Sequence, residues 1–463
     1  MTENFDELLA RTREIALAYI EGLEKRDLSG AADRRALFDS LGGPLGEDPV
    51  DTVAVVEQLA RGADPGIVAT SGGRFFGFVE GGVLPAALAA DWLVSTWDQN
   101  PGFYVLSPAA AVVEEIVAEW LLDVLTLPGT ASVGFTTGAQ IANLTGLAAA
   151  RHRVLAEVGW DVEADGLGGA PPLRVIVGDE RHVTIGRALR FLGLGERKVT
   201  VLPADEQGRM KVEALAVEFQ SSDIPTIVCA QAGNVNTGAF DPVREIAEIA
   251  HEHGAWIHVD GAFGLWAAAS PELRYLADGI GTADSWATDG HKWLNVPYDS
   301  GIVACADPES HRAAMSLHGP YLVRDPASGR NGTDWTPESS RRARVFVIWA
   351  AMRSLGRSGI AAMIERCCEH ARRFASALAE DPGIDILNDV VLNQVLIRVG
   401  DDDELTRRTT RLAREGGQAW LGDTVWKGLT AMRISVSDQA TTDEDVDGAV
   451  AAIRSAVAAA RQT

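Results

Sequence analysis

The spacing of apolar side chains changes twice along the chain. Near the N-terminus they recur every three or four residues, which predicts an amphipathic helix over about 4–25 and a second helical segment over 50–61. A lone amphipathic helix must bury its apolar stripe, either on its own body or on a second subunit. Helical spacing returns at 85–97 and 109–127, where we expect packed helices.

Between residues 133 and 306, short apolar runs alternate with helical segments. Each run is almost continuously apolar, which is typical of strands buried on both faces of a parallel or mixed sheet. The runs lie at 173–177, 198–202, 225–230, 255–260 and 301–306. This order predicts an α/β fold whose large domain has three layers, α/β/α, around a mainly parallel sheet.

Beyond residue 306 the pattern indicates a second, smaller domain. The chain first passes through a polar loop rich in Pro, Gly and Asn at 321–340 and helical stretches at 341–355 and 360–378, and strand-like runs follow at 390–399 and 429–437. Thr442 and Asp445 have the spacing of an N-terminal cap for a closing helix. We therefore expect an N-terminal helical segment (1–73), a large domain (74–349) and a small C-terminal α+β domain (350–463).

The charge balance narrows the classes of function. The 463-residue chain has 65 acidic against 41 basic side chains and a formal net charge of -24, which argues against a nucleic-acid or anionic-membrane partner. Four cysteines without framework spacing favour a reducing compartment, so we expect a cytoplasmic location. The first residues carry acids and no long apolar core, which predicts neither a signal peptide nor a membrane span.

One lysine stands out for its surroundings. Lys292 lies between His291 and Trp293 in a stretch of small and apolar residues, 283–305. A lysine in an apolar setting loses proton affinity, which suits Schiff-base chemistry. A lysine that snorkels from the end of a strand gives the same local pattern, and this stretch alone weighs the two interpretations equally.

Three other segments carry candidate chemistry. At 135–151 a strand-like lead-in, then Thr-Thr-Gly-Ala-Gln, then an Ala/Leu helix would direct free N–H groups at one point, a geometry that binds phosphate. His182 follows a buried run and is either a flat ring facing a ligand or a surface or capping histidine. Asp260 ends an apolar run, where α/β sheets place their ligand groups.

Several rival sites are disfavoured by spacing. His251, His253 and His258 precede Asp260, but no cysteine joins them and the spacing does not match a metal site, so we expect no metal. The chain has no G-x-G-x-x-G between strand and helix and no Walker lysine motif. It also lacks the G-x-S-x-G elbow of many hydrolases.

Taken together, the four segments describe a pyridoxal phosphate site. A phosphate cradle, a ring that can stack, an acid at a strand end and a lysine about 30 residues later are the parts needed to hold this cofactor. In that arrangement the acid keeps the pyridine nitrogen protonated and the lysine forms the Schiff base. No single part is specific, but their order and spacing are.

These residues resemble those of the group II pyridoxal-phosphate-dependent decarboxylases, which include aromatic-L-amino-acid, histidine, glutamate and cysteine-sulfinate decarboxylases. The resemblance runs from about Phe75 to Asp447. It is strongest at HVDGAFG (258–264) and DSWATDGHKWLNVPYDSG (284–301). It is supported by SPAAAVVEE, TTGAQIANLTGLAAAR, AGNVNTGAFDP and RRARVFVIWAAMRSLG.

The resemblance implies a fold-type I homodimer with active sites at the subunit interface and an amino acid as the small-molecule substrate. It implies catalytic roles for four residues: Lys292 as the Schiff-base lysine, Asp260 beside the pyridine nitrogen, His182 stacked on the ring, and Tyr321 as the proton donor in a polar loop. It also places around the cofactor Ala139, Gln140, Asn234, Ala262, Asp289 and His291.

The expected reaction is decarboxylation of an L-α-amino acid to its amine. Aldehyde formation by oxidative deamination, or transamination, is the alternative on the same scaffold, and an inert relative is a third interpretation. The glycine-rich passage 71–82 could form a substrate wall or a loop with a small aromatic cluster, and the residues predicted to bind substrate are Phe76, Phe78, Glu80 and Trp97. Gln140 and Asn234 depart from the family pattern, and the passage before Phe75 lacks the aromatic-rich lead-in of the aromatic enzymes.

Overall fold

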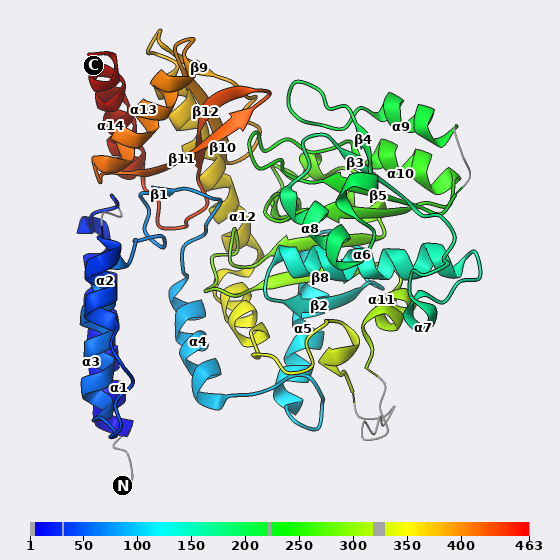
Figure 1. The fold of residues 1–463 in the computed structure, drawn as a ribbon, viewed down its shortest axis with the longest axis horizontal. Helices are drawn as coiled ribbons and strands as arrows, with labels where there is room; N and C mark the ends of the chain where they lie inside the picture. The colour runs from blue at the N-terminus through cyan, green and yellow to red at the C-terminus, as the bar shows by residue number, and fades with distance from the viewer. Residues whose placement is uncertain (1–4, 30–31, 221–223, 318–328, 463) are drawn as a thin grey trace.

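The computed structural model describes residues 5–29, 32–220, 224–317 and 329–462. They form an N-terminal arm of helices, a large α/β domain and a small domain in which the last helix of the chain lies (Figure 1). The arm stands beside the rest of the chain, and the small domain lies above it in this view.

The large domain is built on a seven-stranded sheet in the order β2-β8-β7-β6-β5-β3-β4. Its strands are β2 (Ser132–Thr136), β3 (Arg174–Gly178), β4 (Thr200–Leu202), β5 (Thr226–Gln231), β6 (Trp256–Asp260), β7 (Ser285–Asp289) and β8 (Gly301–Cys305). Only β8 runs antiparallel to its neighbours, and the remaining pairs are parallel. The predicted mainly parallel sheet is therefore confirmed.

Helices cover both faces of this sheet. They are α4 (Pro85–Trp97), α5 (Pro108–Val124), α6 (Ala139–Ala156), α7 (Val162–Asp165), α8 (Val183–Phe191), α9 (Val212–Phe219), α10 (Val243–Glu252) and α11 (Pro308–Met315). Alternate residues of β3 face different layers: Val175 and Val177 pack with α6 and α8, whereas Ile176 belongs to the core that includes α5 and α10. The three-layer architecture follows from strands that are apolar on both faces.

The small domain contains a five-stranded sheet in the order β1-β11-β12-β10-β9. Its strands are β1 (Phe75–Phe76), β9 (Ile384–Ile386), β10 (Gln394–Val399), β11 (Trp420–Trp426) and β12 (Leu429–Ser435), with helices α13 (Asp403–Glu415) and α14 (Asp443–Arg461). The cap predicted at Thr442 is present as a reciprocal capping box with Asp445. β1 pairs with β11, so a segment assigned by sequence to the large domain completes the sheet of the small one.

A long helical run, α12 (Val345–Leu378), crosses from one domain to the other. It is interrupted at Gly356, whose φ of 60° and ψ of -179° are not helical. The two helices predicted at 341–355 and 360–378 therefore meet at this glycine. The domain boundary predicted at residue 349 falls inside the first of them.

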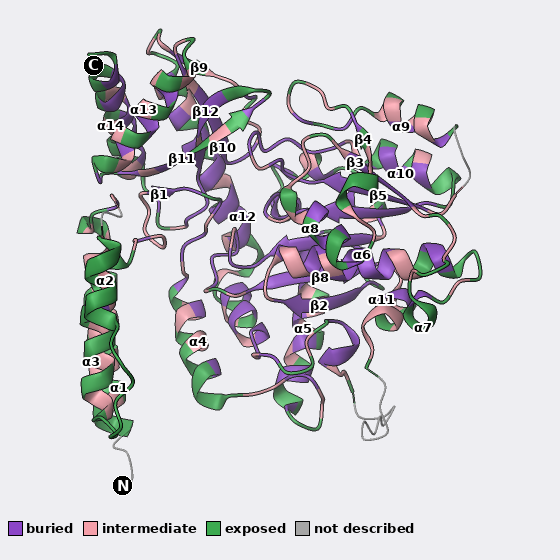
Figure 2. Ribbon diagram, in the orientation of Figure 1, coloured by how far each residue is buried: buried purple, intermediate pink, exposed green. Residues whose placement is uncertain are grey.

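The arm consists of α1 (Phe5–Gly22), α2 (Arg34–Leu41) and α3 (Thr52–Ala63), of which α2 was not predicted. No side chain in these helices is buried, apart from the position of Gly62 (Figure 2). Large apolar side chains such as Phe5, Leu9 and Phe38 are exposed. Within a single chain, the apolar stripe that the sequence predicts remains largely uncovered.

Candidate active site

Two strands of the large sheet end at one edge with carboxylates. β6 ends at Asp260, which lies in register with Gln231 of β5 and Ala287 of β7. β7 ends two residues further along, at Asp289. Because the carboxyl ends of parallel strands share one edge of a sheet, the chain after β3 brings His182 to the same edge.

Lys292 lies in the segment that joins β7 to β8. Its Nζ is 3.2 Å from Oδ2 of Asp289, whose side chain is buried, and one fifth of the lysine side chain is exposed. The apolar setting predicted from the sequence is thus incomplete, because a carboxylate pairs with the amine. Trp266 fixes the end of β7 by donating its Nε1–H to the Asp289 carbonyl at 3.0 Å. The lysine is therefore anchored in the site rather than directed into solvent.

The predicted phosphate cradle is the start of α6. The Ala139 N–H donates to Oδ1 of Asp289 at 2.5 Å, which places a carboxylate where a helix N-terminus favours negative charge. Gly301 packs so closely that an added Cβ would lie 2.4 Å from backbone atoms of Gly138. Oε1 of Gln140 is buried without a hydrogen-bond partner in the part of the chain that the structure describes. The helix start therefore has an N–H that already binds a carboxylate, and Gly301 lets β8 pack closely against it.

His182 is the N-cap residue of α8. Its Nδ1 accepts the Thr184 N–H at 3.4 Å and lies 2.8 Å from the Thr184 hydroxyl. Burial lowers the pKa of the imidazole, although the Asp260 carboxylate acts in the opposite direction. The ring is consequently neutral at neutral pH. It also lines a small pocket together with Asp260, so the capping interpretation is confirmed and the contact with a ligand stays a prediction.

Asp260 is 4% exposed, and its carboxylate accepts the Ala262 N–H at 3.3 Å. No salt bridge to this carboxylate is formed within the described residues. A buried carboxylate requires a cation or a strong donor, and a protonated pyridine nitrogen is such a group. With the start of α6 at the same edge, where its Ala139 N–H reaches Asp289, and a neutral flat ring at His182, the residues present fit pyridoxal phosphate.

His291 and Asn234 support the site in different ways. Nδ1 of His291 accepts the Ser300 N–H at 3.1 Å, and its Nε2 lies 3.4 Å from Asp289. Burial lowers the pKa of this imidazole. The Asn234 amide donates to the Glu180 carbonyl at 3.1 Å and accepts N–H groups of its own loop. Asn234 thus holds the loop after β5, and the cofactor contact expected of it stays a prediction.

The residues predicted to bind substrate do not share one environment. Phe76 is fully buried and packs edge-on against Phe374 at 5.0 Å, so its ring belongs to the core and leaves no face for a substrate. Phe78 and Trp97 are exposed, and Glu80 is half-buried. Tyr321 lies outside the described residues.

The passage that carries Phe78 and Glu80 is held against the lysine segment. An added Cβ on Gly81 would lie 1.8 Å from the Lys292 carbonyl oxygen. The Gly82 N–H donates to Asn295 at 2.8 Å. Phe78 and Val79 both have positive φ, 52° and 64°, a region that costs energy for residues with a Cβ. Backbone strain of this kind clusters at functional sites.

Sequence reasoning missed several polar residues behind the site. Asn143, Thr184 and Ser285 are hydrogen-bonded to histidines there. Asn143 stands one helical turn after Ala139, and this spacing was the only sequence signal for its place on the same face of α6. Partners of this kind depend on how the helix meets the sheet, which no local pattern encodes.

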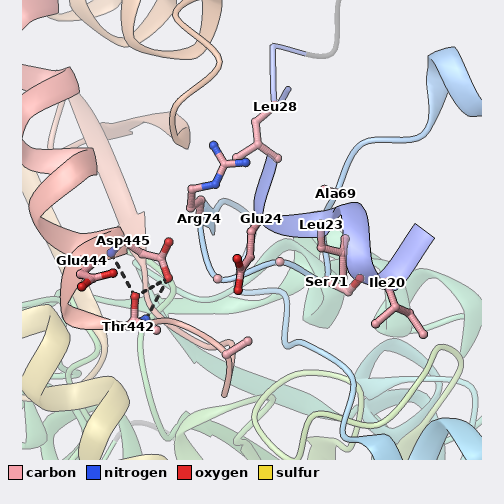
Figure 3. Close-up of a pocket in the computed structure, with 13 residues that line it drawn as sticks. Ile20, Leu23, Glu24, Leu28, Ala69, Ser71, Arg74, Thr442, Glu444 and Asp445 are labelled. Carbon is pink, nitrogen blue, oxygen red and sulfur yellow. Dashed lines mark hydrogen bonds between the residues drawn. The ribbon is translucent and has the colours of Figure 1, made fainter. Parts of the chain in front are cut away.

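A separate pocket lies at the base of the arm, where the end of α1, the segment 69–74 and the start of α14 meet (Figure 3). Glu24, Arg74 and Asp445 are among its lining residues. Asp445 is already engaged there by Thr442 in the capping box. None of the predicted site residues lines this pocket.

The histidines that were weighed as metal ligands, and rejected, do not lie together. His251 and His253 are exposed at the end of α10, whereas His258 is buried inside β6. Across residues 5–29, 32–220, 224–317 and 329–462, no group of three or more His, Cys, Asp or Glu side chains is placed to hold a metal ion. Over the same residues, no helix has the length and apolar content needed to cross a membrane.

Comparison with known proteins identifies relatives over almost the whole chain. A model of the pyridoxal-dependent decarboxylase conserved domain matches residues 44–399. A tryptophan decarboxylase of Camptotheca acuminata is 25% identical over 450 residues, covering 93% of this chain and 89% of that protein. A phenylacetaldehyde synthase of Arabidopsis thaliana is 26% identical over 415 residues, covering 85% and 83%. The solved structure of Oryza sativa TDC with PLP and tryptamine superposes with a TM-score of 0.92 at 23% identity, covering 99% and 98%.

Proposed function

The chain belongs to the pyridoxal-dependent decarboxylase family, and on that basis we propose that it converts an L-α-amino acid to the corresponding amine and carbon dioxide through Lys292. Membership makes the protein a carboxy-lyase that uses pyridoxal phosphate on an amino acid. One observation carries the proposal for this chain: the Lys292 amine, 3.2 Å from Asp289, lies at the same sheet edge as the buried carboxylate of Asp260.

Each residue at this edge would bind a different part of the cofactor. Lys292 would bond to it through Nζ, and the first turn of α6 with Gln140 would bind its phosphate. His182 would cover one face of the ring and Ala262 the other. When bound, pyridoxal phosphate supplies a ring that accepts the electron pair left by the departing carboxyl group.

Asp260 and Asp289 have different proton roles in this scheme. Asp260, buried and without a cationic partner in the described residues, would hold a proton at the pyridine nitrogen and so keep the ring positive. Asp289, 3.2 Å from Nζ, can accept the proton that Lys292 must lose before its amine becomes a nucleophile. His182, neutral because of its burial, excludes water from the ring face without adding a second positive charge.

Tyr321 is proposed as the group that protonates the substrate carbon after carbon dioxide leaves. This role rests on the resemblance alone, because residue 321 is outside the described part of the chain. Aldehyde formation remains the second candidate because one relative is named a phenylacetaldehyde synthase. That reaction consumes dioxygen and releases ammonia and hydrogen peroxide, which distinguishes it from simple decarboxylation.

Exposed apolar surface supports a homodimer with active sites at the interface. Leu9, Leu17 and Leu59 of the arm are at least 40% exposed. Phe78 and Trp97, which we propose to line the substrate side, are 62% and 48% exposed. Apolar surface of this extent is rarely left uncovered in a monomer. A second copy would cover both groups and complete the wall near Glu80.

A cytoplasmic location is part of the proposal. All four cysteines are free and buried, and burial raises the pKa of Cys229 to about 12. Thiols of this kind are unreactive and form no disulfides. They suit a reducing compartment.

The reaction is tested by offering the holoenzyme a panel of aromatic, acidic, basic and aliphatic L-amino acids. Carbon dioxide, amine, aldehyde, ammonia and hydrogen peroxide are measured separately. We expect carbon dioxide and amine in equal amounts from one substrate class. Lys292→Ala should lower kcat by at least about 10⁴-fold because the covalent step is lost, whereas Lys211→Ala, which removes an exposed lysine, should not.

Two outcomes would contradict the proposal. Absence of carbon dioxide from every amino acid, or full activity in Lys292→Ala, would exclude decarboxylation through this lysine. Tyr321→Phe separates the two product classes: release of aldehyde with hydrogen peroxide supports its role as proton donor, whereas unchanged amine production at an unchanged rate excludes that role.

A further inference from the structure

Behind His182, hydrogen bonds between buried side chains join the neighbouring strands β6 and β7 and then lead from β6 to α6. Trp256 donates its Nε1–H to the Ser285 hydroxyl at 2.9 Å. The same hydroxyl lies 2.8 Å from Nδ1 of His258, and Nε2 of His258 lies 2.8 Å from Oδ1 of Asn143. Ser285, His258 and Asn143 are each 0% exposed. These contacts form an unbroken path from an indole to an amide.

The path continues from α6 to α8. Nδ2 of Asn143 donates to the Thr184 hydroxyl at 3.4 Å, and that hydroxyl lies 2.8 Å from Nδ1 of His182. The backbone N–H of Thr184 also points at Nδ1, at 3.4 Å. His182 is therefore the last member of the path, and its ring lines the pocket that also contains Asp260.

The chemistry of the two ends sets the direction of every hydrogen bond. An indole N–H can only donate, so the Ser285 oxygen accepts from Trp256. The hydroxyl proton of Ser285 then needs an acceptor, and Nδ1 of His258 is the one within the path. His258 is neutral because burial lowers its pKa to about 3, so its one proton is on Nε2 and is donated to Asn143. The Asn143 amide then donates to Thr184.

The last step fixes His182. The Thr184 oxygen accepts from Asn143, so its hydroxyl proton is free to be donated to Nδ1 of His182. Nδ1 also receives the Thr184 backbone N–H, and a nitrogen that accepts cannot carry the proton of a neutral ring. The opposite direction would place two donors face to face at Nδ1 and leave the Ser285 hydroxyl proton without an acceptor in the path.

We propose that Trp256, Ser285, His258 and Asn143 are positioning residues that hold His182 in the tautomer with its proton on Nε2. The ring then presents one N–H donor to the pocket, in a fixed orientation. Gly146 allows this arrangement, because an added Cβ would lie 2.8 Å from His258 and push α6 away from β6. The tautomer follows from the hydrogen bonds alone, and only its use in the reaction rests on the proposed function.

Asn143→Asp is the sharpest test. A carboxylate of the same shape still accepts from His258 but cannot donate to Thr184, so the path is cut at one atom. The readout is the ¹⁵N NMR spectrum of histidine side chains in the holoenzyme, with His182→Gln identifying the signals of His182. The unaltered protein should show a protonated Nε2 and an unprotonated Nδ1, and Asn143→Asp should mix the two tautomers.

Activity gives a second readout if the enzyme turns over. Asn143→Asp should lower kcat about 10- to 100-fold with little change in KM, since a positioning defect acts on the reacting complex. The added carboxylate should also move the pH profile upward. The charged groups that face His182 are Asp260, Lys292, Arg433 and Asp289, and none is altered by the substitution.

Asn393→Asp is the matched control. Asn393 is also 0% exposed, and it donates to Val436 and Ser437 in the small domain. It should lower stability without changing the tautomer of His182. Trp256→Phe, which removes only the first donor, should mix the tautomers less than Asn143→Asp and serves if that variant does not fold.

Two results would overturn the proposal. One is a proton on Nδ1 of His182 in the unaltered protein. The other is an unchanged tautomer in both Asn143→Asp and Trp256→Phe. Because the NMR signals do not require turnover, either result is distinct from a failure to decarboxylate amino acids.

Discussion

The N-terminal arm and the strand-end site are opposites in how far a single chain completes them. At the site, Asp289, His182 and His258 are each held by partners from the same chain. In α1 to α3, by contrast, apolar side chains such as Leu9 and Phe38 remain exposed. The polar side chains of the strand-end site find their partners within one chain, and we call this the closed region. The apolar side chains of the arm are exposed, and we call this the open region.

The two regions differ in what their side chains need in order to be buried. A buried polar group must find its hydrogen-bond partners within the fold, because an unpaired one costs about 1–3 kcal/mol. An amphipathic helix needs only an apolar surface, and a second subunit supplies one as well as the same chain does. The side chains of the site are therefore fixed within one chain, whereas the apolar side chains of the arm would be covered only in the proposed dimer.

Breaking the proposed assembly should have the largest effect. Leu9→Lys with Leu17→Lys would place two ammonium groups in the surface that we expect a second copy to bury, and each costs several kcal/mol there. We expect the dimer dissociation constant to rise by at least about 1,000-fold. Analytical ultracentrifugation would detect monomers, and decarboxylation should fall in parallel.

A charge change on the solvent side of the same helix is the control. Glu14 is 63% exposed and forms a surface pair with Arg11, so Glu14→Lys should leave association within a factor of a few. A double lysine variant that sediments as the unaltered protein does would show that the arm packs elsewhere. The proposal that a second copy covers the apolar side chains of the arm would then be wrong.

Much of the closed region could be predicted from the sequence. The apolar runs match β3 to β6 and β8 within two residues, because strands buried on both faces have a continuous apolar pattern. The capping box at Thr442 was predicted because it depends only on residues three apart. Lys292 and Asp260 were predicted from their order along the chain, and their arrival at one sheet edge follows from parallel topology.

The rest depends on contacts between distant segments. β1 is two residues long and exists only because β11 lies beside it, so no local pattern predicts it. Phe76 was assigned to a substrate wall because it stands in the glycine-rich passage 71–82, whereas Phe374, almost 300 residues away, places its ring in the core. The donor path to His182 likewise joins α6, β6, β7 and α8, and partners across that distance have no sequence spacing.

An intermediate effect on stability is expected at Asp438, a buried polar residue whose hydrogen bonds are incomplete within one chain. Its carboxyl group is buried beside Gly82, and its Oδ2 has no partner in the described part of the chain. Burial raises the pKa of this carboxyl from 3.8 to about 7. The folded state therefore retains a proton that the unfolded chain has lost between about pH 4 and pH 7, so stability falls as pH rises through that window.

Asp438→Asn should remove this loss. The variant should match the unaltered protein near pH 4 and exceed it above pH 7 by on the order of 4 kcal/mol at most. Urea unfolding at several pH values measures the difference, which cancels the opposite contributions of His258 and His311, whose pKa values are lowered by burial. Parallel curves for the two proteins would mean that Asp438 is charged in the fold.

The smallest effect on stability is expected at Glu80. It shows whether this residue belongs to the part of the site that one chain completes. Burial raises the pKa of this half-buried carboxyl, and no ion pair to it is formed by the residues that the structure describes. A raised carboxyl pKa costs stability at neutral pH. Glu80→Gln should therefore stabilise the protein by less than about 1 kcal/mol if the second copy brings no cation to this carboxyl. Glu163→Gln is the opposite case, because Glu163 lies 2.5 Å from His152, and it should destabilise by about 1 kcal/mol. Thermal unfolding of the protein measures both. If Glu80→Gln instead destabilises the protein as Glu163→Gln does, a cation from a second copy pairs with Glu80. The passage beside Lys292 would then be completed by the second copy, as the arm is.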